Sequence, residues 1–318
     1  MNRVKGIFKA LIVLATFISV LMLSCDGYAK REIDALVSPD WLGINIVNPR
    51  LVVLDVRSAE EYNKGHIPGA INVPVAFPSS AWTVVRGDIL FELPSDADLS
   101  KTISQAGIKK DSLVVVVGRT AGPMAQYAMA DATRVAVTLI YAGIENVAVL
   151  DGGFDKWAWE GKAVSTQPIT PQASDYRVSP RKEMFVSKTY VQKNLKKAIV
   201  VDARDAEAYF GVKAEPWGPK PGHIPTAKSL PAPWLWNMTS DYGVYRDRNE
   251  LREIAKALFG DPKAGKEIIV YCGVGGYAST VGFVLMEALG YKNVRIYDGS
   301  IQEWSLDSKM PLVKYRWE

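Results

Sequence analysis

The sequence predicts an α/β protein of two tandem domains, each a mostly parallel sheet flanked by helices. Its 318 residues are a length typical of two domains. Short β-branched runs alternate with helical patterns, as parallel sheets covered on both faces require. The chain also repeats itself, because the segment around Asp55 recurs around Asp202 and the one around Asp151 recurs around Asp298, both 147 residues later. These observations indicate a duplicated domain.

The composition is that of an ordinary globular protein, with 48% hydrophobic and 23% charged residues. The net charge of +4 is small and no run of Lys and Arg forms a basic stripe. We therefore expect no nucleic-acid partner, whereas small anionic substrates stay compatible with the charge. We expect neither a metal ion nor a cofactor.

Residues 1–29 are typical of an export signal, because three basic residues precede an apolar run from Ala10 to Leu23 that is short for a membrane span. Ser24-Cys25 resembles a lipobox, which would place a lipid anchor on Cys25. Alternatively, cleavage after Ala29 would release a soluble protein. In either case we expect an exported protein, located in the periplasm or cell envelope.

The first domain is predicted over residues 35–164 and the second over residues 182–318, joined by a linker over residues 165–181 that is rich in Pro, Ser and Gln. Buried strands are predicted at residues 51–55, 113–117, 147–150, 198–202, 267–271 and 294–297. Turns beginning at Asp151 and Asp298 are expected to start the helices that carry Trp157 and Trp304, and we interpret these turns as scaffold.

Comparison of the two copies distinguishes residues that serve the fold from residues that serve catalysis. The two histidines of the chain, His66 and His223, occupy equivalent Gly-His-Ile-Pro motifs. A feature present in both copies is expected to serve the fold, so we predict hydrogen-bonded structural rings and no Cys-His dyad.

An Asp-x-Arg pair follows the first buried strand of each copy, as Asp55 with Arg57 and as Asp202 with Arg204. Its presence in both halves favours a buried hydrogen-bonding network. The alternative is a carboxylate-binding role, in which Arg204 would contact a substrate.

Cys272 ends a strand-like run and precedes glycines at positions 273, 275 and 276. Such a loop allows backbone N–H groups to converge on one side chain, and a helical pattern from Ala278 onward would add the positive end of a helix dipole. We expect these donors to favour the thiolate and make Cys272 the catalytic nucleophile. The alternative is a buried structural cysteine. The predicted active-site loop is Gly273, Val274, Gly275, Gly276 and Tyr277.

The second copy carries about ten additional residues between Phe210 and Pro221, hereafter the insertion. Lys220 is a candidate contact for an anionic substrate, and Trp217 is a candidate wall of the pocket. A solvated loop with a packed tryptophan is an equally good interpretation.

Gly118 of the first copy stands opposite Cys272 and has no side chain for chemistry. We therefore predict a non-catalytic first domain. It is expected to supply an interface and, through Arg119 or Arg134, substrate contacts.

With these residues assembled, the chain resembles the tandem-domain rhodanese family of sulfurtransferases over nearly its whole length. The resemblance rests on the Asp-x-Arg pairs, both Gly-His-Ile-Pro motifs, the Cys272 loop and the Asp-Gly turns with their tryptophans. It implies that Cys272 takes the outer sulfur of a donor as a persulfide and passes it to a thiol or cyanide. Such covalent catalysis predicts ping-pong kinetics.

The resemblance implies a small anionic donor, thiosulfate or 3-mercaptopyruvate. Thiosulfate-using members carry Arg and Lys directly after the cysteine, where this chain has Gly273 and Val274. Mercaptopyruvate-using members carry Gly-Ser-Gly-Val-Thr, whose serine and threonine are here Val274 and Tyr277. Lys220 lies where family members often have a basic residue before the Gly-His motif.

Two alternatives to a sulfurtransferase are a phosphatase and a sulfur carrier. A phosphatase class with the same fold needs an arginine six residues after the cysteine, where this chain has Ala278, so phosphatase activity is remote. The stronger alternative is a sulfur or selenium carrier, or redox partner, whose Cys272 persulfide is delivered to another exported protein without turnover of small molecules.

Overall fold

The computed structural model describes residues 31–262 and 265–318. Its two five-stranded sheets are entirely parallel and have the same strand order. The first has the order β1-β7-β6-β2-β3, and the second, read in the same direction, has the order β8-β14-β13-β9-β10. The predicted fold class is confirmed.

All six predicted strands are present, and three of them, at residues 51–55, 113–117 and 294–297, have both bounds as predicted. The first sheet consists of β1 (Leu36–Val37), β2 (Leu51–Asp55), β3 (Ile71–Asn72), β6 (Leu113–Val117) and β7 (Asn146–Leu150). The second consists of β8 (Phe185–Val186), β9 (Ile199–Asp202), β10 (Lys228–Ser229), β13 (Ile268–Tyr271) and β14 (Val294–Tyr297). The two-residue edge strands were not predicted, because runs this short carry no alternation of apolar and polar residues.

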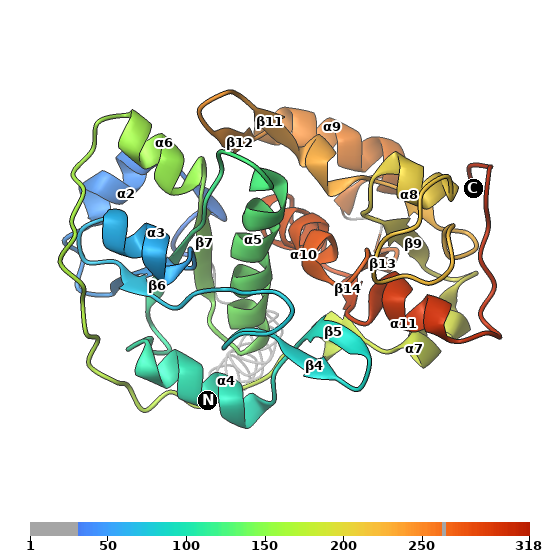
Figure 1. The fold of residues 1–318 in the computed structure, drawn as a ribbon, viewed down its shortest axis with the longest axis horizontal. Coiled ribbons are helices and arrows are strands. Elements are labelled where there is room, and N and C mark those ends of the chain that lie inside the picture. Colours follow the sequence, from blue (N-terminus) through green and yellow to red (C-terminus); the bar gives the residue numbers. More distant parts are fainter. Residues whose placement is uncertain (1–30, 263–264) are drawn as a thin grey trace, which may run out of the picture. The chain divides into compact units, whose positions relative to one another are not determined.

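Helices cover both faces of each sheet, and two antiparallel hairpins lie outside the sheets (Figure 1). The first domain contains α2 (Pro39–Asn45), α3 (Ala59–Lys64), α4 (Asp96–Gln105), α5 (Ala125–Tyr141), α6 (Gly153–Trp159) and the hairpin β4 (Val84–Arg86) with β5 (Ile89–Glu92). The second contains η1 (Lys182–Met184), α7 (Lys188–Asn194), α8 (Ala206–Phe210), η2 (Ala232–Leu235), the hairpin β11 (Trp236–Met238) with β12 (Gly243–Tyr245), α9 (Arg248–Phe259), α10 (Gly276–Phe283), a π turn η4 (Val284–Ala288) and α11 (Ser300–Leu306). None of the helices in the described part of the chain is both long and apolar enough to cross a bilayer.

Equivalent serines start the first helix of each domain. Ser38 accepts a hydrogen bond from the N–H of Trp41 before α2, and Ser187 accepts one from Tyr190 before α7. Each serine satisfies one of the N–H groups that a helix leaves without an intrahelical partner. The internal repeat therefore extends to the signals that begin the helices.

The linker predicted over residues 165–181 lacks helices and β-strands, but it is attached to the first domain at several points. Ser165 pairs with His66 in an isolated bridge, and the Ser174 hydroxyl donates to the Ile108 carbonyl at 2.6 Å. The buried Tyr176 donates its hydroxyl proton to the Ala142 carbonyl at 2.8 Å. The segment therefore crosses the surface of the first domain as an ordered strap.

The two domains meet along α5 and α10, which lie side by side (Figure 1). At their centre the hydroxyls of Thr133 and Thr280 share a buried hydrogen bond of 2.7 Å. One apolar cluster continues from the first sheet through these helices to the second sheet. The interface is therefore a hydrophobic core with a buried polar contact at its centre.

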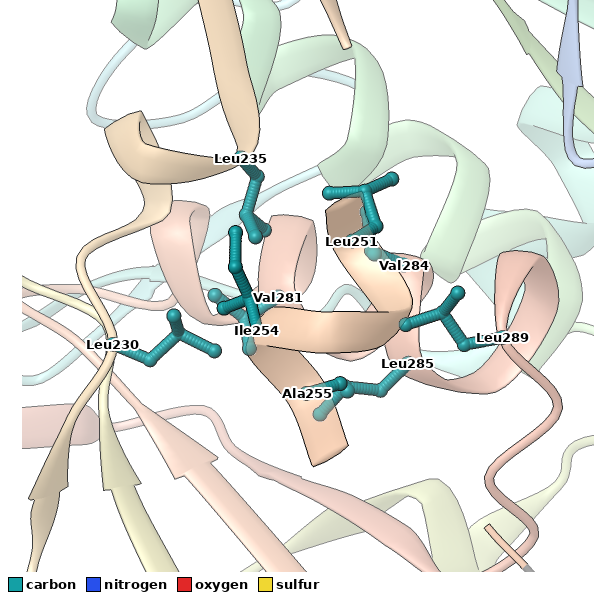
Figure 2. Close-up of a pocket in the computed structure, with 9 residues that line it drawn as sticks. All are labelled: Leu230, Leu235, Leu251, Ile254, Ala255, Val281, Val284, Leu285 and Leu289. Carbon is teal, nitrogen blue, oxygen red and sulfur yellow. The ribbon is translucent and has the colours of Figure 1, made fainter. Parts of the chain in front are cut away.

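A small apolar gap lies between α9, α10 and the π turn. Figure 2 shows that only aliphatic side chains point into it. Ligand sites need polar groups that orient the bound molecule, and this lining has none. The gap is therefore a packing feature of the second domain. Its lining is Leu230, Leu235, Leu251, Ile254, Ala255, Val281, Val284, Leu285 and Leu289.

Candidate active site

Cys272 directly follows β13, whose four residues are all buried, and it precedes a sharp turn into α10. Gly275 has φ of 94°, a left-handed conformation that favours glycine, and it caps the helix. The helix begins at Gly276 and not at Ala278, so that prediction was wrong by two residues. A glycine in the first turn is tolerated there because the cap residue, and not helix propensity, sets the start of the helix.

The Cys272 loop is held by the turn before α11. Ser300 accepts a hydrogen bond from the Cys272 N–H at 3.1 Å and donates to the Tyr297 carbonyl at 2.9 Å. The N–H of Ile301 donates to the Cys272 carbonyl at 2.9 Å. Ser300 has φ of 52°, a strained value for a residue with a side chain. The interpretation of this turn as scaffold alone missed that Ser300 positions the cysteine backbone.

The thiol lies where the loop predicted it, against backbone donors. The Gly275 N–H donates to Cys272 Sγ at 3.1 Å, and the residue is only 3% exposed. Burial raises the pKa of the Cys272 thiol, the N–H groups of Ala278, Val274 and Gly275 lower it, and the Glu215 carboxylate raises it. Since burial dominates, the expectation that the donors make thiolate the favoured form was wrong for this closed arrangement. The donors oppose the cost of burial without overcoming it.

The insertion covers the loop. A Cβ on Gly273 would lie 2.2 Å from Trp217 Nε1 and 3.0 Å from Glu215 Oε1. Only glycine allows so close an approach, which explains why position 273 lacks a side chain. The indole N–H of Trp217 is buried and has no hydrogen-bond partner. Trp217 therefore lies against the loop, as one interpretation of the sequence held, and Glu215 is a further residue of the site.

Lys220 points elsewhere. Its ammonium donates to the carbonyl of Asp307 at 3.1 Å, just beyond the C-terminal end of α11. Ser300, which contacts Cys272, lies at the opposite end of that seven-residue helix, about 10 Å away. The structure therefore brings Trp217 to the loop and does not bring the Lys220 ammonium there.

The guanidinium of Arg204 is paired with carboxylates of the protein itself. Its guanidinium forms a bidentate contact with Asp202, at 2.6 Å between Nη2 and Oδ2, and donates to the Gly222 carbonyl at 2.8 Å. Arg57 makes the same contacts with Asp55 and the Gly65 carbonyl in the first domain. The predicted buried network is thus present in both halves. Only the second half adds a carboxylate, because Arg204 Nη1 also lies 3.3 Å from Glu215 Oε2.

The histidines are equivalent in structure as well as in sequence. The ring of His66 stacks on Tyr62 at 3.8 Å between centroids, and that of His223 stacks on Tyr209 at 3.9 Å. In each ring Nδ1 contacts the carbonyl of the same tyrosine at 2.9 Å. Nε2 of His66 also contacts a carbonyl, at 3.1 Å, whereas Nε2 of His223 has no hydrogen-bond partner. Both rings therefore hold the turn that precedes an edge strand, through stacking and a contact with a backbone carbonyl.

Aromatic side chains of the first domain complete the surroundings of the loop. Tyr127 stacks on Tyr277 with centroids 5.4 Å apart, and Phe77 lies 6.0 Å from Trp217. Burial, followed by the carboxylates of Asp205 and Glu215, raises the pKa of Tyr127. Sequence reasoning missed these contributions, because nothing in a linear pattern links residues so far apart in the chain.

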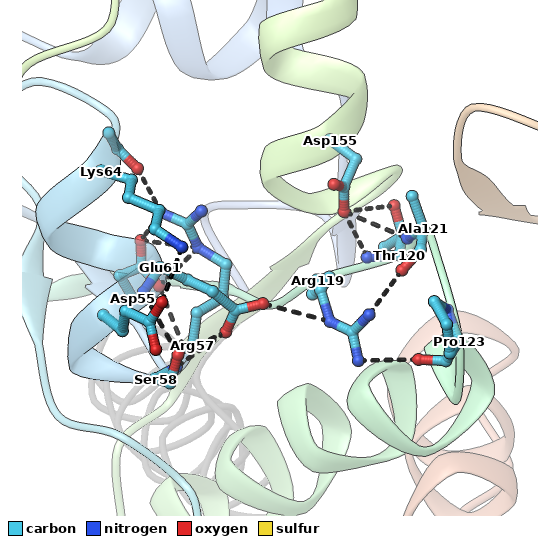
Figure 3. Close-up of polar contacts among 12 residues, drawn as sticks. Asp55, Arg57, Ser58, Glu61, Lys64, Arg119, Thr120, Ala121, Pro123 and Asp155 are labelled. Atoms are coloured by element: carbon cyan, nitrogen blue, oxygen red, sulfur yellow. Dashed lines mark hydrogen bonds and ion pairs between the residues drawn. The ribbon is translucent and has the colours of Figure 1, made fainter.

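Substrate contacts were predicted for Arg119 and Arg134. In the structure both arginines instead contact other groups of the protein. Arg134 is fully buried and forms an ion pair with Asp298 of the second domain, so it belongs to the interface. Arg119 lies between Glu61 and the carbonyls of Ala121 and Pro123 (Figure 3). Both cations therefore have partners within the chain.

The counterpart of the Cys272 loop in the first domain is filled by the protein itself. The N–H groups of Thr120 and Ala121 donate to the Asp155 carboxylate at 2.5 and 3.1 Å (Figure 3). A Cβ on Gly118 would lie 3.0 Å from the Cβ of Ala132 and 3.2 Å from the carbonyl oxygen of Ala128. The first domain thus keeps backbone donors like those of the second but binds its own carboxylate. Among the residues described, no three His, Cys, Asp or Glu side chains gather as a metal site.

Comparisons with known proteins agree with this architecture. A family model, the rhodanese-like domain, matches residues 38–160 and again residues 187–307. The sulfur carrier protein TtuD of Thermus thermophilus is 31% identical over 301 residues, which cover 91% of this chain and 99% of that protein. A putative thiosulfate sulfurtransferase of Mycobacterium tuberculosis is 30% identical, covering 85% of this chain and 94% of that protein.

Solved structures of EanB share the fold. The wild-type structure matches with a TM-score of 0.74 at 26% identity, covering 88% of this chain and 69% of that chain. EanB with ergothioneine covalently linked to a cysteine persulfide matches with a TM-score of 0.75 at 25% identity, covering 89% and 71%. These matches and the two rhodanese-like domains show that the chain is a tandem-domain member of the rhodanese family of sulfurtransferases.

Proposed function

We propose that the chain transfers a sulfane sulfur through a persulfide on Cys272. The observation that carries this proposal is the position of Sγ, which ends a buried strand and accepts the Gly275 N–H at 3.1 Å. Among the described residues it is also the one cysteine, and it is unpaired. A nucleophile held by backbone donors is the arrangement that covalent transfer needs.

The transfer has two balanced steps. In the first, the Cys272 thiolate attacks the outer sulfur of the donor, the donor's sulfur bond breaks, and its electron pair leaves with the remainder. From thiosulfate the leaving group is sulfite, and from 3-mercaptopyruvate, with one proton taken up, it is pyruvate. In the second, a thiolate or cyanide attacks the outer sulfur of the persulfide, and the electron pair of the S–S bond returns to Cys272. The N–H donors stabilise the anion on sulfur at the start and at the end.

We propose that the donor is a small anion, either thiosulfate or 3-mercaptopyruvate. The charge of the donor decides which of the two is favoured. Glu215 Oε1 faces the loop, and the loop itself carries no basic side chain. A carboxylate repels a dianion more than a monoanion, so 3-mercaptopyruvate is favoured over thiosulfate.

A carrier without significant small-molecule turnover is the second candidate. It is favoured by the 3% exposure of Cys272 beneath the insertion and by the similarity to a protein named as a sulfur carrier. Its acceptor would be another protein. A carrier loads one sulfur and releases none to small thiols or cyanide, whereas an enzyme cycles.

Mass spectrometry after incubation with each donor separately tests the proposal. We expect one added sulfur on the Cys272 peptide and none in Cys272→Ser, whose fold is checked by circular dichroism. Subsequent addition of a thiol or cyanide distinguishes enzyme from carrier by whether further turnovers follow. Sulfur transfer that persists in Cys272→Ser contradicts the mechanism.

Export is part of the proposal and rests on residues 1–29, all of which lie outside the described part of the chain. A basic start followed by an apolar run supports an export signal, and Ser24-Cys25 supports a lipid anchor in the cell envelope. An exported thiol protein would then be the partner of the carrier form. The mass of the mature N-terminus tests this, because an unmodified chain beginning at Lys30 would contradict lipidation.

A further inference from the structure

The charged groups around the Cys272 loop are unusual for a site that would take an anion. Glu215 extends over Gly273, with its side chain 19% exposed, and Asp205 is an exposed carboxylate close enough to influence Tyr127 and Tyr277. The guanidinium of Arg204 pairs with Asp202 and also lies 3.3 Å from Glu215 Oε2, so one cation is shared by two carboxylates. Lys213 is an exposed cation beside Asp205. The side of the loop nearest the thiol therefore presents carboxylate.

Aromatic side chains lie beside the same loop. Tyr127, at 37% exposure, stacks on Tyr277, and Phe77, at 54% exposure, lies against Trp217. The two exposed rings come from the first domain and the two covered rings from the second. Carboxylate beside several aromatic faces is the combination that binds ammonium and methylated ammonium groups, because the ring faces and the carboxylate both attract positive charge.

The hydroxyl of Tyr277, like the indole N–H of Trp217, is a buried polar group of the site without a hydrogen-bond partner. Tyr277 is only 8% exposed, its ring stacks on that of Tyr127, and its hydroxyl has no hydrogen-bond partner. A buried hydroxyl without a partner costs free energy unless a ligand supplies one. Because Tyr277 lies at the end of the Cys272 loop, in the first turn of α10, that ligand would lie beside the site.

We propose that the sulfur acceptor of Cys272 is a small thiol that carries a positively charged nitrogen, selected by Glu215 and the rings of Tyr127, Tyr277 and Trp217. This inference rests on the proposed function and names the substrate class of the same site. The acceptor attacks the outer sulfur of the persulfide as its thiolate, the S–S bond breaks, and its electron pair returns to Cys272, while the cationic nitrogen of the acceptor lies against Glu215. The same carboxylate disfavours acceptors whose tail is anionic, so the preference between acceptors comes from attraction and repulsion together.

Discharge of the loaded protein tests the proposal directly. The Cys272 persulfide is discharged in single-turnover experiments by cysteamine, which is cationic, 2-mercaptoethanol, which is neutral, and 3-mercaptopropionate, which is anionic. The compared quantity is the ratio of the cysteamine rate to the 3-mercaptopropionate rate in each variant, because differences in intrinsic thiol reactivity cancel between variants. We expect this ratio to fall about tenfold in Glu215→Gln, the factor for loss of one partly screened charge contact. Glu253→Gln, on the surface of α9, is the matched control and should leave the ratio unchanged.

A second probe tests the same charge without sulfur transfer. Methanethiosulfonate reagents react with a thiolate to give a mixed disulfide and methanesulfinate, and they exist with trimethylammonium, neutral and sulfonate tails. In the wild type we expect the trimethylammonium reagent to modify Cys272 fastest and the sulfonate reagent slowest. Glu215→Gln should compress this order, and Tyr127→Leu should slow the trimethylammonium reagent alone.

The two proposals fail differently. A protein whose Cys272 accepts no sulfur from any donor overturns the proposed function. A protein that loads sulfur, but whose discharge ratio is the same in the wild type and Glu215→Gln, overturns this inference and leaves the proposed function standing. A preference for 3-mercaptopropionate that Glu215→Gln leaves intact also overturns it.

Discussion

Arg134 of the first domain and Asp298 of the second form a buried ion pair, with 2.5 Å between Nη1 and Oδ1. A second N–H···O contact of 3.1 Å makes it bidentate, and the Leu93 N–H also donates to Asp298. A Cβ placed on Gly275 would lie 3.2 Å from Arg134 Nη1, so the pair touches the Cys272 loop. The interface and the candidate active site therefore share one polar contact.

Arg134→Met should destabilise the protein by about 3–5 kcal/mol, because it leaves the buried Asp298 without its cation. Urea unfolding measures the change. The double variant Arg134→Met, Asp298→Leu removes both charges and should recover much of the loss. A single variant as stable as the wild type would show that the pair contributes little.

Gly273→Ala should displace the insertion, because the new methyl would occupy the space of the Trp217 indole. We expect a lower melting temperature and faster alkylation of Cys272 by iodoacetamide. Gly218→Ala is a matched control within the insertion, where the nearest atoms lie 3.7 Å from an added Cβ. Adding Trp217→Ala to Gly273→Ala should restore the melting temperature. If the two substitutions instead lower the melting temperature additively, Gly273→Ala does not act by a clash with Trp217.

Ser300→Gly should reduce sulfur transfer with little change in stability. Glycine relieves the left-handed strain of about 1 kcal/mol or more, while loss of the hydrogen bond to the Cys272 N–H costs a similar amount. The equivalent residue of the first domain is Gly153, which shows that glycine fits this turn. The rate of persulfide formation at saturating donor and the unfolding midpoint separate the two effects. An unchanged rate would assign Ser300 to the scaffold alone.

Lys220→Ala should leave the KM for either donor unchanged and lower stability by about 1 kcal/mol. Its ammonium donates to the Asp307 carbonyl at the end of α11, where a cation also interacts favourably with the helix dipole. Steady-state kinetics and urea unfolding measure the two quantities. A raised KM would return Lys220 to the role that its position in the sequence suggested.

The alkylation of Cys272 should depend on pH as a raised thiol pKa requires. Only the thiolate reacts, and burial with the Glu215 carboxylate raises the pKa above its ordinary value of 9.0. The iodoacetamide rate should therefore keep rising with pH beyond the midpoint of an exposed cysteine. Glu215→Gln should move the midpoint to lower pH. A rate already constant below neutral pH would show a preformed thiolate.

The sequence predicted the parts of the molecule that repeat. Strands, the two histidine turns and the Asp-x-Arg pairs follow from local patterns that occur twice, and the paired copies separated them from Cys272. The roles of Glu215 and Ser300 were missed, because each depends on a contact between segments far apart in the chain. The pKa of Cys272 was misjudged for the same reason, since glycines in a loop reveal donors but not the burial that an insertion adds.

The carboxylate of Asp155 has a consequence for the history of the duplication. Because it binds the N–H groups of Thr120 and Ala121, these donors of the first domain have a hydrogen-bond partner within the chain and need no ligand. Gly118→Cys alone would place a thiol against the Cβ of Ala132 and introduce a sulfur where Asp155 already holds the donors. No single substitution would restore a nucleophile there. The division between one catalytic and one supporting half would thus be fixed by several residues at once, which leaves the first domain free to diverge toward shaping the site of its twin.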